Sequence, residues 1–65
     1  MRINDDRIRE IVSEYENKTE LAYRLELSIA TLYNIAAGRR KAGRKVLMAL
    51  VNKLGINFDE LIIDR

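Results

Sequence analysis

The stretch KTELAYRLELSIATLYNIAA, residues 18–37, predicts two short helices joined by a tight turn. Its apolar residues recur at the three- and four-residue spacing that places side chains on one face of a helix. These residues are Leu21, Ala22 and Leu25 in the first helix, Leu27 in the turn, and Leu32 and Ile35 in the second helix. Ala22 is small at the point where the two helices would cross closely. We therefore expect apolar contacts to lock the two helices against each other.

A run rich in arginine and lysine, GRRKAGRK at residues 38–45, follows this helix pair directly. Residues 39–53 carry six basic residues and no acidic one, although the net charge of the whole chain is only +2. Acidic residues outnumber basic ones in residues 1–17 and in residues 54–65. A basic segment between two acidic ends is expected for a protein with a polyanionic partner. The helix spacing and the basic run together are typical of a DNA-binding helix-turn-helix, whose second helix enters the major groove.

Length and composition argue against several other classes of protein. The 65 residues predict one small domain, residues 1–65, with the helix-turn-helix motif at 18–37. The chain has no cysteine and no histidine, which removes disulfides, thiolate metal sites and the commonest general base. No Gly-rich loop or carboxylate pair points to an active site, so we expect no enzyme, no metal and no cofactor. No apolar run approaches a membrane span, and Asp5, Asp6 and Arg7 interrupt any signal-peptide pattern, so we expect a cytoplasmic protein.

Periodicity and capping residues divide the chain into five predicted helices around one core, which is an all-α fold. The predicted ranges are about 5–16, 18–25, 29–37, 44–54 and 58–63. Good N-cap residues precede four of these helices: Asn4, Asn17, Ser28 and Asn57. Leu27 and Leu32 have the spacing of a hydrophobic staple, which would fix the angle at which the third helix begins.

With its helices in this order, the chain resembles the Cro and phage-repressor family of helix-turn-helix regulators, also called the XRE family. The resemblance covers residues 4–63 and rests on two separate segments. The first is the apolar pattern of residues 18–37, followed by Gly38 and the basic run. The second is LGINFDEL at residues 54–61, which is similar to the family's usual Leu-Gly-Val-Ser-hydrophobic-Asp-Glu-Leu. The resemblance implies a five-helix fold of the lambda-repressor type and a sequence-specific transcriptional repressor of a phage or mobile element.

Three residues depart from the family pattern. Glu26 stands at the turn position that is usually Gly, so we expect a strained left-handed backbone there. Ala36 replaces a common Glu near the end of the third helix, and we expect the following loop to lack that polar anchor. Ala42 stands where the family often has Pro, so we expect a more mobile loop. Together the three departures predict a looser or less stable variant.

The resemblance implies that the third helix reads bases with Ile29, Ala30, Tyr33 and Asn34. Ile29 and Ala30 could contact a thymine methyl group, and Asn34 could make two hydrogen bonds to adenine, so we predict an A·T-leaning half-site. Tyr33 has two interpretations: its hydroxyl could reach a phosphate or its ring stack on sugar, or the side chain could pack against the loop before the fourth helix.

The resemblance implies that Ser28 and Thr31 lie near the DNA backbone and that Lys18, at the start of the second helix, contacts a phosphate. The basic run supplies the other predicted phosphate contacts, which are Arg39, Arg40, Lys41, Arg44 and Lys45. Backbone N–H groups in the first turn of the second helix could also hold a phosphate. The alternative is that the charge run is only a solvated face, and its position beside the motif favours the phosphate role.

The predicted partners are double-stranded operator or promoter DNA and a second copy of the chain, because family members often bind two half-sites about one helical turn apart. The candidate dimer contacts are Phe58, Leu61, Ile62 and Ile63. Alternatively, Leu61 and Ile62 simply close the core. A second functional hypothesis is a modulator that binds a larger repressor or a toxin, because Ile29, Ala30 and Tyr33 would also suit a protein interface.

Overall fold

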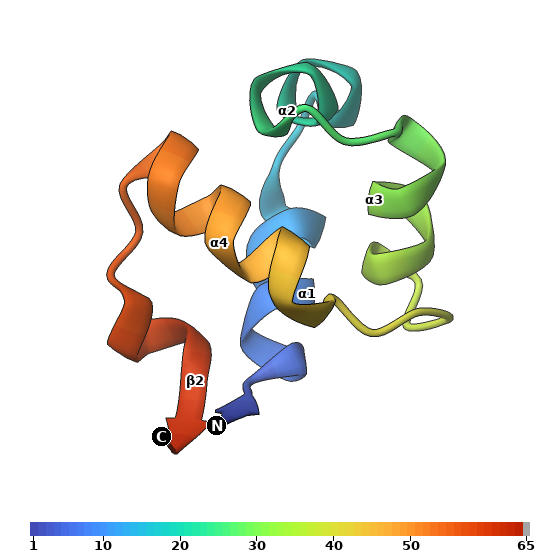
Figure 1. Cartoon of the computed structure of the whole chain (residues 1–65). Helices are drawn as coiled ribbons and strands as arrows, with labels where there is room; N and C mark the ends of the chain where they lie inside the picture. Colours follow the sequence, from blue (N-terminus) through green and yellow to red (C-terminus); the bar gives the residue numbers. More distant parts are fainter. Residues whose placement is uncertain (65) are drawn as a thin grey trace.

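Four amphipathic helices and a short terminal ribbon make up the computed structural model, which describes residues 1–64 (Figure 1). The helices are α1 (Asp5–Glu14), α2 (Lys18–Leu25), α3 (Ile29–Ala36) and α4 (Gly43–Leu54). A short 3-10 helix, η1 (Phe58–Leu61), follows α4. The strands β1 (Arg2–Ile3) and β2 (Ile62–Asp64) pair in antiparallel fashion and join the two ends of the chain.

The helix starts are fixed by the side chains that the sequence predicts as N-caps. Asn4 Oδ1 accepts a hydrogen bond from the Arg7 backbone N–H, at 3.0 Å. Asn17 and Ser28 accept equivalent bonds from the backbone N–H groups three residues on, at 3.0 and 3.1 Å. Each bond satisfies a backbone donor that has no partner within its own helix. The predicted starts of α1, α2 and α3 are therefore confirmed.

The core lies among the helices, where the inner face of α3 packs on α1 and α2, and α4 packs on α2 and η1. Its buried side chains come from every helix of the described chain. They are Ile8, Val12, Leu21, Ala22, Leu25, Leu32, Ile35, Ala42, Val46, Leu47, Leu50 and Leu61. Five of the six apolar residues that the motif predicts as inward are buried, and Leu27 is half-buried against the same core. Packing of α3 on α1 and α2 thus holds one face of α3 inside and leaves the other outside.

The predicted helix over residues 58–63 is wrong in its type and in its end. Residues 58–61 form a 3-10 turn, and the chain then extends at Ile62, with φ −126° and ψ 153°. Ile62 pairs with Ile3, which lies at the other end of the sequence. Pairing over that distance leaves no trace in local periodicity, so neither β1 nor β2 was predicted. The helix predicted over 5–16 also ends early, at Glu14, because Tyr15 is extended.

The turn between α2 and α3 contains the left-handed residue that the sequence predicts. Glu26 has φ 57° and ψ 41° and ends α2. Its backbone N–H donates to the carbonyl of Tyr23, and the N–H of Leu27 donates to the carbonyl of Ala22. The Glu26 carboxylate pairs with the Lys53 ammonium group of α4, at 2.8 Å. Lys53 holds the pKa of Glu26 below its ordinary value, so this pairing is present at neutral pH and is lost as the pH falls through the lowered pKa.

Glu26→Gly is expected to raise the melting temperature by a few degrees, roughly 3–6 °C. Glycine adopts the left-handed conformation without a clash, whereas glutamate is strained there. The substitution also removes the ion pair with Lys53, but both side chains are exposed, and such pairs stabilise a fold weakly. Thermal unfolding followed by circular dichroism measures the change, with Lys53→Met as the control for the ion pair alone. A melting temperature lowered by Glu26→Gly would show that the ion pair outweighs the strain.

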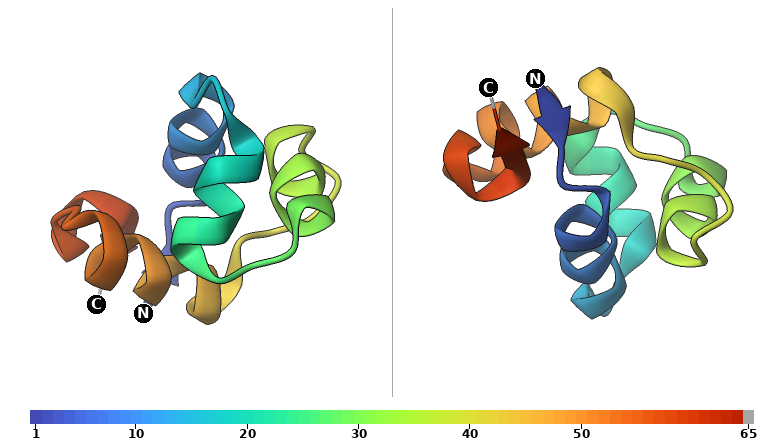
Figure 2. Two further views of the ribbon diagram at one scale, coloured as in Figure 1. Left: turned by 90° about the horizontal axis from the view of Figure 1, so that it is seen from above. Right: turned by 90° about the horizontal axis from the view of Figure 1, so that it is seen from below.

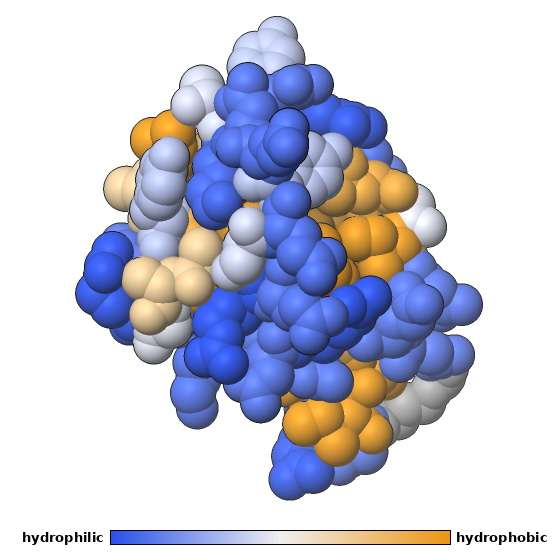
Figure 3. All heavy atoms as spheres, turned by 180° about the vertical axis from the view of Figure 1, so that it is seen from behind, coloured by the Kyte–Doolittle hydropathy of each residue, from blue (hydrophilic) through white to orange (hydrophobic). Residues whose placement is uncertain are grey.

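The strands β1 and β2 lie side by side on the part of the molecule that faces away from α3 (Figure 2). The view from behind shows apolar surface in separate patches between hydrophilic areas (Figure 3). No helix within residues 1–64 combines the length and the apolar character that crossing a membrane requires. Because β1 and β2 lie on the other side of the molecule, they leave the outer face of α3 and the loop after it open to a partner.

Candidate functional site

Helix α3 presents an uncharged outer face. Leu32 and Ile35 are buried, and Ala36 is half-buried, as the helix pattern predicts. On the other side, Ile29 is 40% exposed and Tyr33 is 52% exposed. Ala30 is also exposed, while Asn34 is half-buried at the edge of this face. The four residues predicted to read bases therefore lie together on α3, although their contact with DNA stays a prediction.

The end of α3 brings the basic run back onto that helix. Gly38 has φ 75°, a left-handed conformation that glycine adopts without steric cost. Its N–H donates to the carbonyl of Ile35, at 3.0 Å, and the N–H of Arg39 donates to the carbonyl of Asn34, at 2.9 Å. This pair of bonds is a Schellman motif, which reverses the chain at a helix end. The side chain of Arg39 consequently begins beside that of Asn34.

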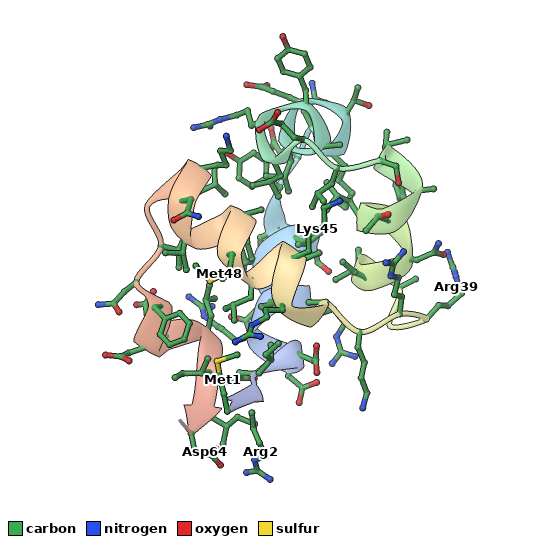
Figure 4. The ribbon with its side chains drawn as sticks, in the orientation of Figure 1. Met1, Arg2, Arg39, Lys45, Met48 and Asp64 are labelled. Carbon is green, nitrogen blue, oxygen red and sulfur yellow. The ribbon has the colours of Figure 1, made fainter. Side chains whose placement is uncertain are left out.

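Two arginines of the basic segment, which we define as residues 39–45, reach α3 with their side chains. Arg39 Nε donates to Asn34 Oδ1, at 2.9 Å. A terminal nitrogen of Arg40 makes a longer contact of 3.5 Å with Thr31 Oγ1. The guanidinium groups remain exposed, and Arg39 projects from the molecule on the side of α3 (Figure 4). Positive charge is thus placed directly beside the outer face of α3.

A hydrogen bond from the backbone of Ala42 to a side chain of α1 anchors the basic segment. The N–H of Ala42 donates to Asp5 Oδ1, at 3.0 Å, and the Ala42 side chain is buried in the core. Proline at this position would have no N–H to donate. The expectation that the loop lacks a polar anchor is therefore wrong. Asp5, at the start of α1, supplies an anchor that the missing Glu at Ala36 does not.

Asp5→Ala is expected to destabilise the protein by about 1–2 kcal/mol, because the partly buried N–H of Ala42 loses its acceptor. The matched control is Asp5→Asn, which keeps an acceptor oxygen and loses only the charge near the start of α1, worth about 0.3–1 kcal/mol. Urea unfolding measures the loss, and amide hydrogen exchange at Ala42 locates it. Unchanged exchange at Ala42 in Asp5→Ala would contradict the anchoring role.

The remaining basic side chains of the segment are exposed and have no partner within residues 1–64. Lys41, Arg44 and Lys45 are exposed, and within residues 1–64 they form no hydrogen bond or ion pair. Arg44 and Lys45 lie in the first turn of α4, which contains no acidic residue and has no side-chain cap. The N-terminus of a helix is its positive end, so these charges add to the potential there. The positive side chains and the positive helix end repel one another, and a bound anion would relieve that repulsion.

Three other predicted phosphate contacts have partners inside the chain. The Ser28 hydroxyl caps α3 and shares a hydrogen bond of 2.7 Å with the Thr31 hydroxyl. The Lys18 ammonium group donates to the carbonyls of Tyr15, at 3.1 Å, and Ser13, at 3.4 Å. An ammonium group has three N–H donors, so Lys18 keeps one for a further acceptor. Within the chain, the Lys18 ammonium group satisfies two carbonyl oxygens at the end of α1.

Sequence reasoning missed the part of α1 that borders the basic segment. An open cleft of about 330 Å³ lies between them, lined by Asp5, Asp6, Arg9, Ile35, Gly38, Arg39, Arg40 and Lys41. Arg9 donates to Asp6, at 3.0 Å, and keeps a position beside Gly38. These residues lie on the polar face of α1, and nothing in helix periodicity distinguishes them from other surface charges. Arg9 therefore lies at the edge of the site as one half of an ion pair with Asp6.

The predicted dimer contacts differ in how far their side chains are exposed to a second copy of the chain. Leu61 is fully buried in the core of its own chain, so its side chain is not free for a second copy. Phe58 and Ile62 are half-buried against the same core. Ile63 is exposed, together with Met1 and Met48. The interpretation that Leu61 closes the core is confirmed, and the exposed apolar side chains lie away from α3.

Comparison of the chain with models of protein families, with curated proteins and with solved structures finds no match. A functional conclusion therefore rests on the residues and geometry described above.

Proposed function

We propose that this protein is a sequence-specific DNA-binding regulator, in which α2 and α3 act as a helix-turn-helix. Helix α3 would lie in the major groove, and the basic segment would bind phosphates beside it. The resemblance to Cro and phage repressors favours a repressor of a phage or mobile element, which acts in the cytoplasm by occupying promoter DNA and blocking polymerase.

The observation that carries this function is the placement of the basic segment against α3. Arg39 and Arg40 contact Asn34 and Thr31, so positive charge borders an exposed, uncharged helix face. Phosphate contacts position a protein on the duplex, and side chains on the helix face then meet base edges. Two of the five basic side chains in the segment contact α3 in this way, which supports a phosphate role beside that helix.

The roles follow from the chemistry of each group. Ile29 and Ala30 offer apolar contact to thymine methyl groups, and Asn34 offers an acceptor and a donor to adenine. Tyr33 would reach sugar or phosphate from the same face. Arg39, Arg40, Lys41, Arg44 and Lys45 would bind phosphates, with Lys18, Ser28 and Thr31 as further contacts. An A·T-leaning half-site follows from this set.

A fluorescence titration tests the function directly. The DNA upstream of the protein's own gene is labelled and compared with a scrambled duplex of equal composition, at several salt concentrations. We expect tighter binding to the native duplex, with a log–log salt slope of about −0.9 for each phosphate contact. Weak and equal binding to both duplexes at low salt would reject a DNA-binding role.

A second candidate function is favoured by the same outer face of α3. Ile29 and Tyr33 are large, exposed and uncharged, which suits a protein interface as well as a groove. The protein would then act on a larger repressor, as an antirepressor or corepressor, or on a toxin, as an antitoxin. A homodimer fits either function, and Ile63 with Met1 and Met48 offers the exposed apolar surface for it. Sedimentation with and without duplex measures that assembly.

A further inference from the structure

Asn34 carries a side chain whose orientation decides what it can recognise. An asparagine amide has an acceptor oxygen at one end and a donor nitrogen at the other. The last side-chain torsion is broad and nearly two-fold, so an unrestrained amide samples both orientations. Only one of them matches adenine, which presents the N6 donor and the N7 acceptor side by side in the major groove. A base-reading asparagine therefore benefits from a neighbour that distinguishes its two ends.

Arg39 is that neighbour. Its Nε donates to Asn34 Oδ1, at 2.9 Å, and its backbone N–H donates to the Asn34 carbonyl, also at 2.9 Å. A guanidinium group has donors and no acceptor, so a flipped amide would place its own N–H₂ group against the Nε–H. We propose that Arg39 is a positioning residue for base recognition, which holds the Asn34 amide in the orientation that pairs with adenine. This inference rests on the proposed DNA-binding function.

The contact leaves both partners able to bind DNA. A carbonyl oxygen has two lone pairs, so Oδ1 keeps one for the adenine N6 group while Nδ2 donates to N7. The terminal guanidinium nitrogens of Arg39 keep their donors for a phosphate. Arg39 would thus bind a DNA phosphate and orient Asn34 toward the base at the same time. The left-handed Gly38 makes this arrangement possible, because it turns Arg39 toward Asn34.

Arg39→Lys separates the positioning role from the charge. Lysine keeps the positive charge, but its Cε methylene occupies the place of the arginine Nε, so nothing donates to Oδ1 from that position. Arg40→Lys is the matched comparison, because Arg40 contacts Thr31 and not Asn34. Asn34→Ala identifies the base pair that Asn34 reads. Melting temperatures of all variants establish that each is folded.

The experiment selects bound duplexes from a random pool with the wild type and the three variants, and then measures affinities and salt slopes for the selected sites. We expect Asn34→Ala and Arg39→Lys to lose preference at the same base pair, by roughly tenfold or more. Arg39→Lys should keep the wild-type salt slope. Arg40→Lys, at a phosphate contact, should change the affinity for all sequences about equally and leave the order of preference among bases unchanged.

Three different results would overturn the inference. If Arg39→Lys keeps the preference that Asn34→Ala loses, or if Asn34→Ala loses none, Arg39 does not act through Asn34, while the DNA-binding function stands. If the wild type selects no sequence from the pool, the proposed function fails and the inference fails with it.

Discussion

Reversing the charge of Arg39 and Arg40 together is expected to reduce affinity for duplex DNA by about 100-fold or more at 0.15 M salt. Both guanidinium groups are exposed beside α3, where phosphates would lie on either side of a helix in the groove. Arg39→Glu with Arg40→Glu removes two cations and adds two anions that repel the backbone. The salt slope should also become shallower by about 2 units, because two phosphates are no longer neutralised. Fluorescence anisotropy of a labelled duplex at four salt concentrations measures both quantities.

The control must change net charge equally at another place. Arg2→Glu with Lys53→Glu does so, since these residues lie in β1 and in the last turn of α4, outside the basic segment. Each exchanges one exposed ion pair for a like-charge contact, with Asp64 or with Glu26, and melting temperatures establish that the control is folded. If both double variants bind DNA equally well, the effect is one of overall charge, and the basic segment is a solvated surface after all.

The same double variant discriminates between the two candidate functions. A partner protein that binds the uncharged face of Ile29 and Tyr33 does not depend on phosphate contacts. Arg39→Glu with Arg40→Glu should therefore abolish DNA binding and leave association with a larger repressor or a toxin largely intact. Ile29→Asp would damage both functions, so it carries no information on this question.

Local signals explain why so much of the fold could be predicted from the sequence. The caps Asn4, Asn17 and Ser28 act within three residues, and the apolar stripe of α4 repeats within its own helix. Such features are visible in any short window of the chain. The left-handed Glu26 was predicted differently, from the family resemblance, because Glu26 stands at a turn position that is usually Gly in that family.

Contacts between distant residues explain what the sequence did not reveal. The β1–β2 ribbon joins Ile3 to Ile62, and the anchor of the basic segment joins Asp5 to Ala42. Neither pair has a signal in periodicity or capping. The candidate site also has one part that could be predicted and one that could not. The exposure of the outer face of α3 could be predicted, because it follows from the spacing of apolar residues along one helix. The contact of Arg39 with Asn34 depends instead on how the chain reverses at Gly38.

Leu32→Ala is expected to destabilise the protein by about 3–5 kcal/mol. Leu32 is fully buried on the inner face of α3, where it packs against the core formed with α1 and α2. A domain of this size has a total stability of only about 3–10 kcal/mol, so the loss removes much or all of it. The melting temperature should fall by at least about 12 °C, and circular dichroism with urea unfolding measures the change.

Ile29→Ala provides the contrast on the outer face of the same helix. Ile29 is partly exposed, so its truncation should change stability by less than about 1 kcal/mol. Leu32→Met keeps the buried volume and should cost less than about 1.5 kcal/mol. If the outer face reads DNA, Ile29→Ala weakens binding in a folded protein, whereas Leu32→Ala weakens it by unfolding. A melting temperature of Leu32→Ala within 5 °C of the wild type would mean that α3 is not held by the packing described here.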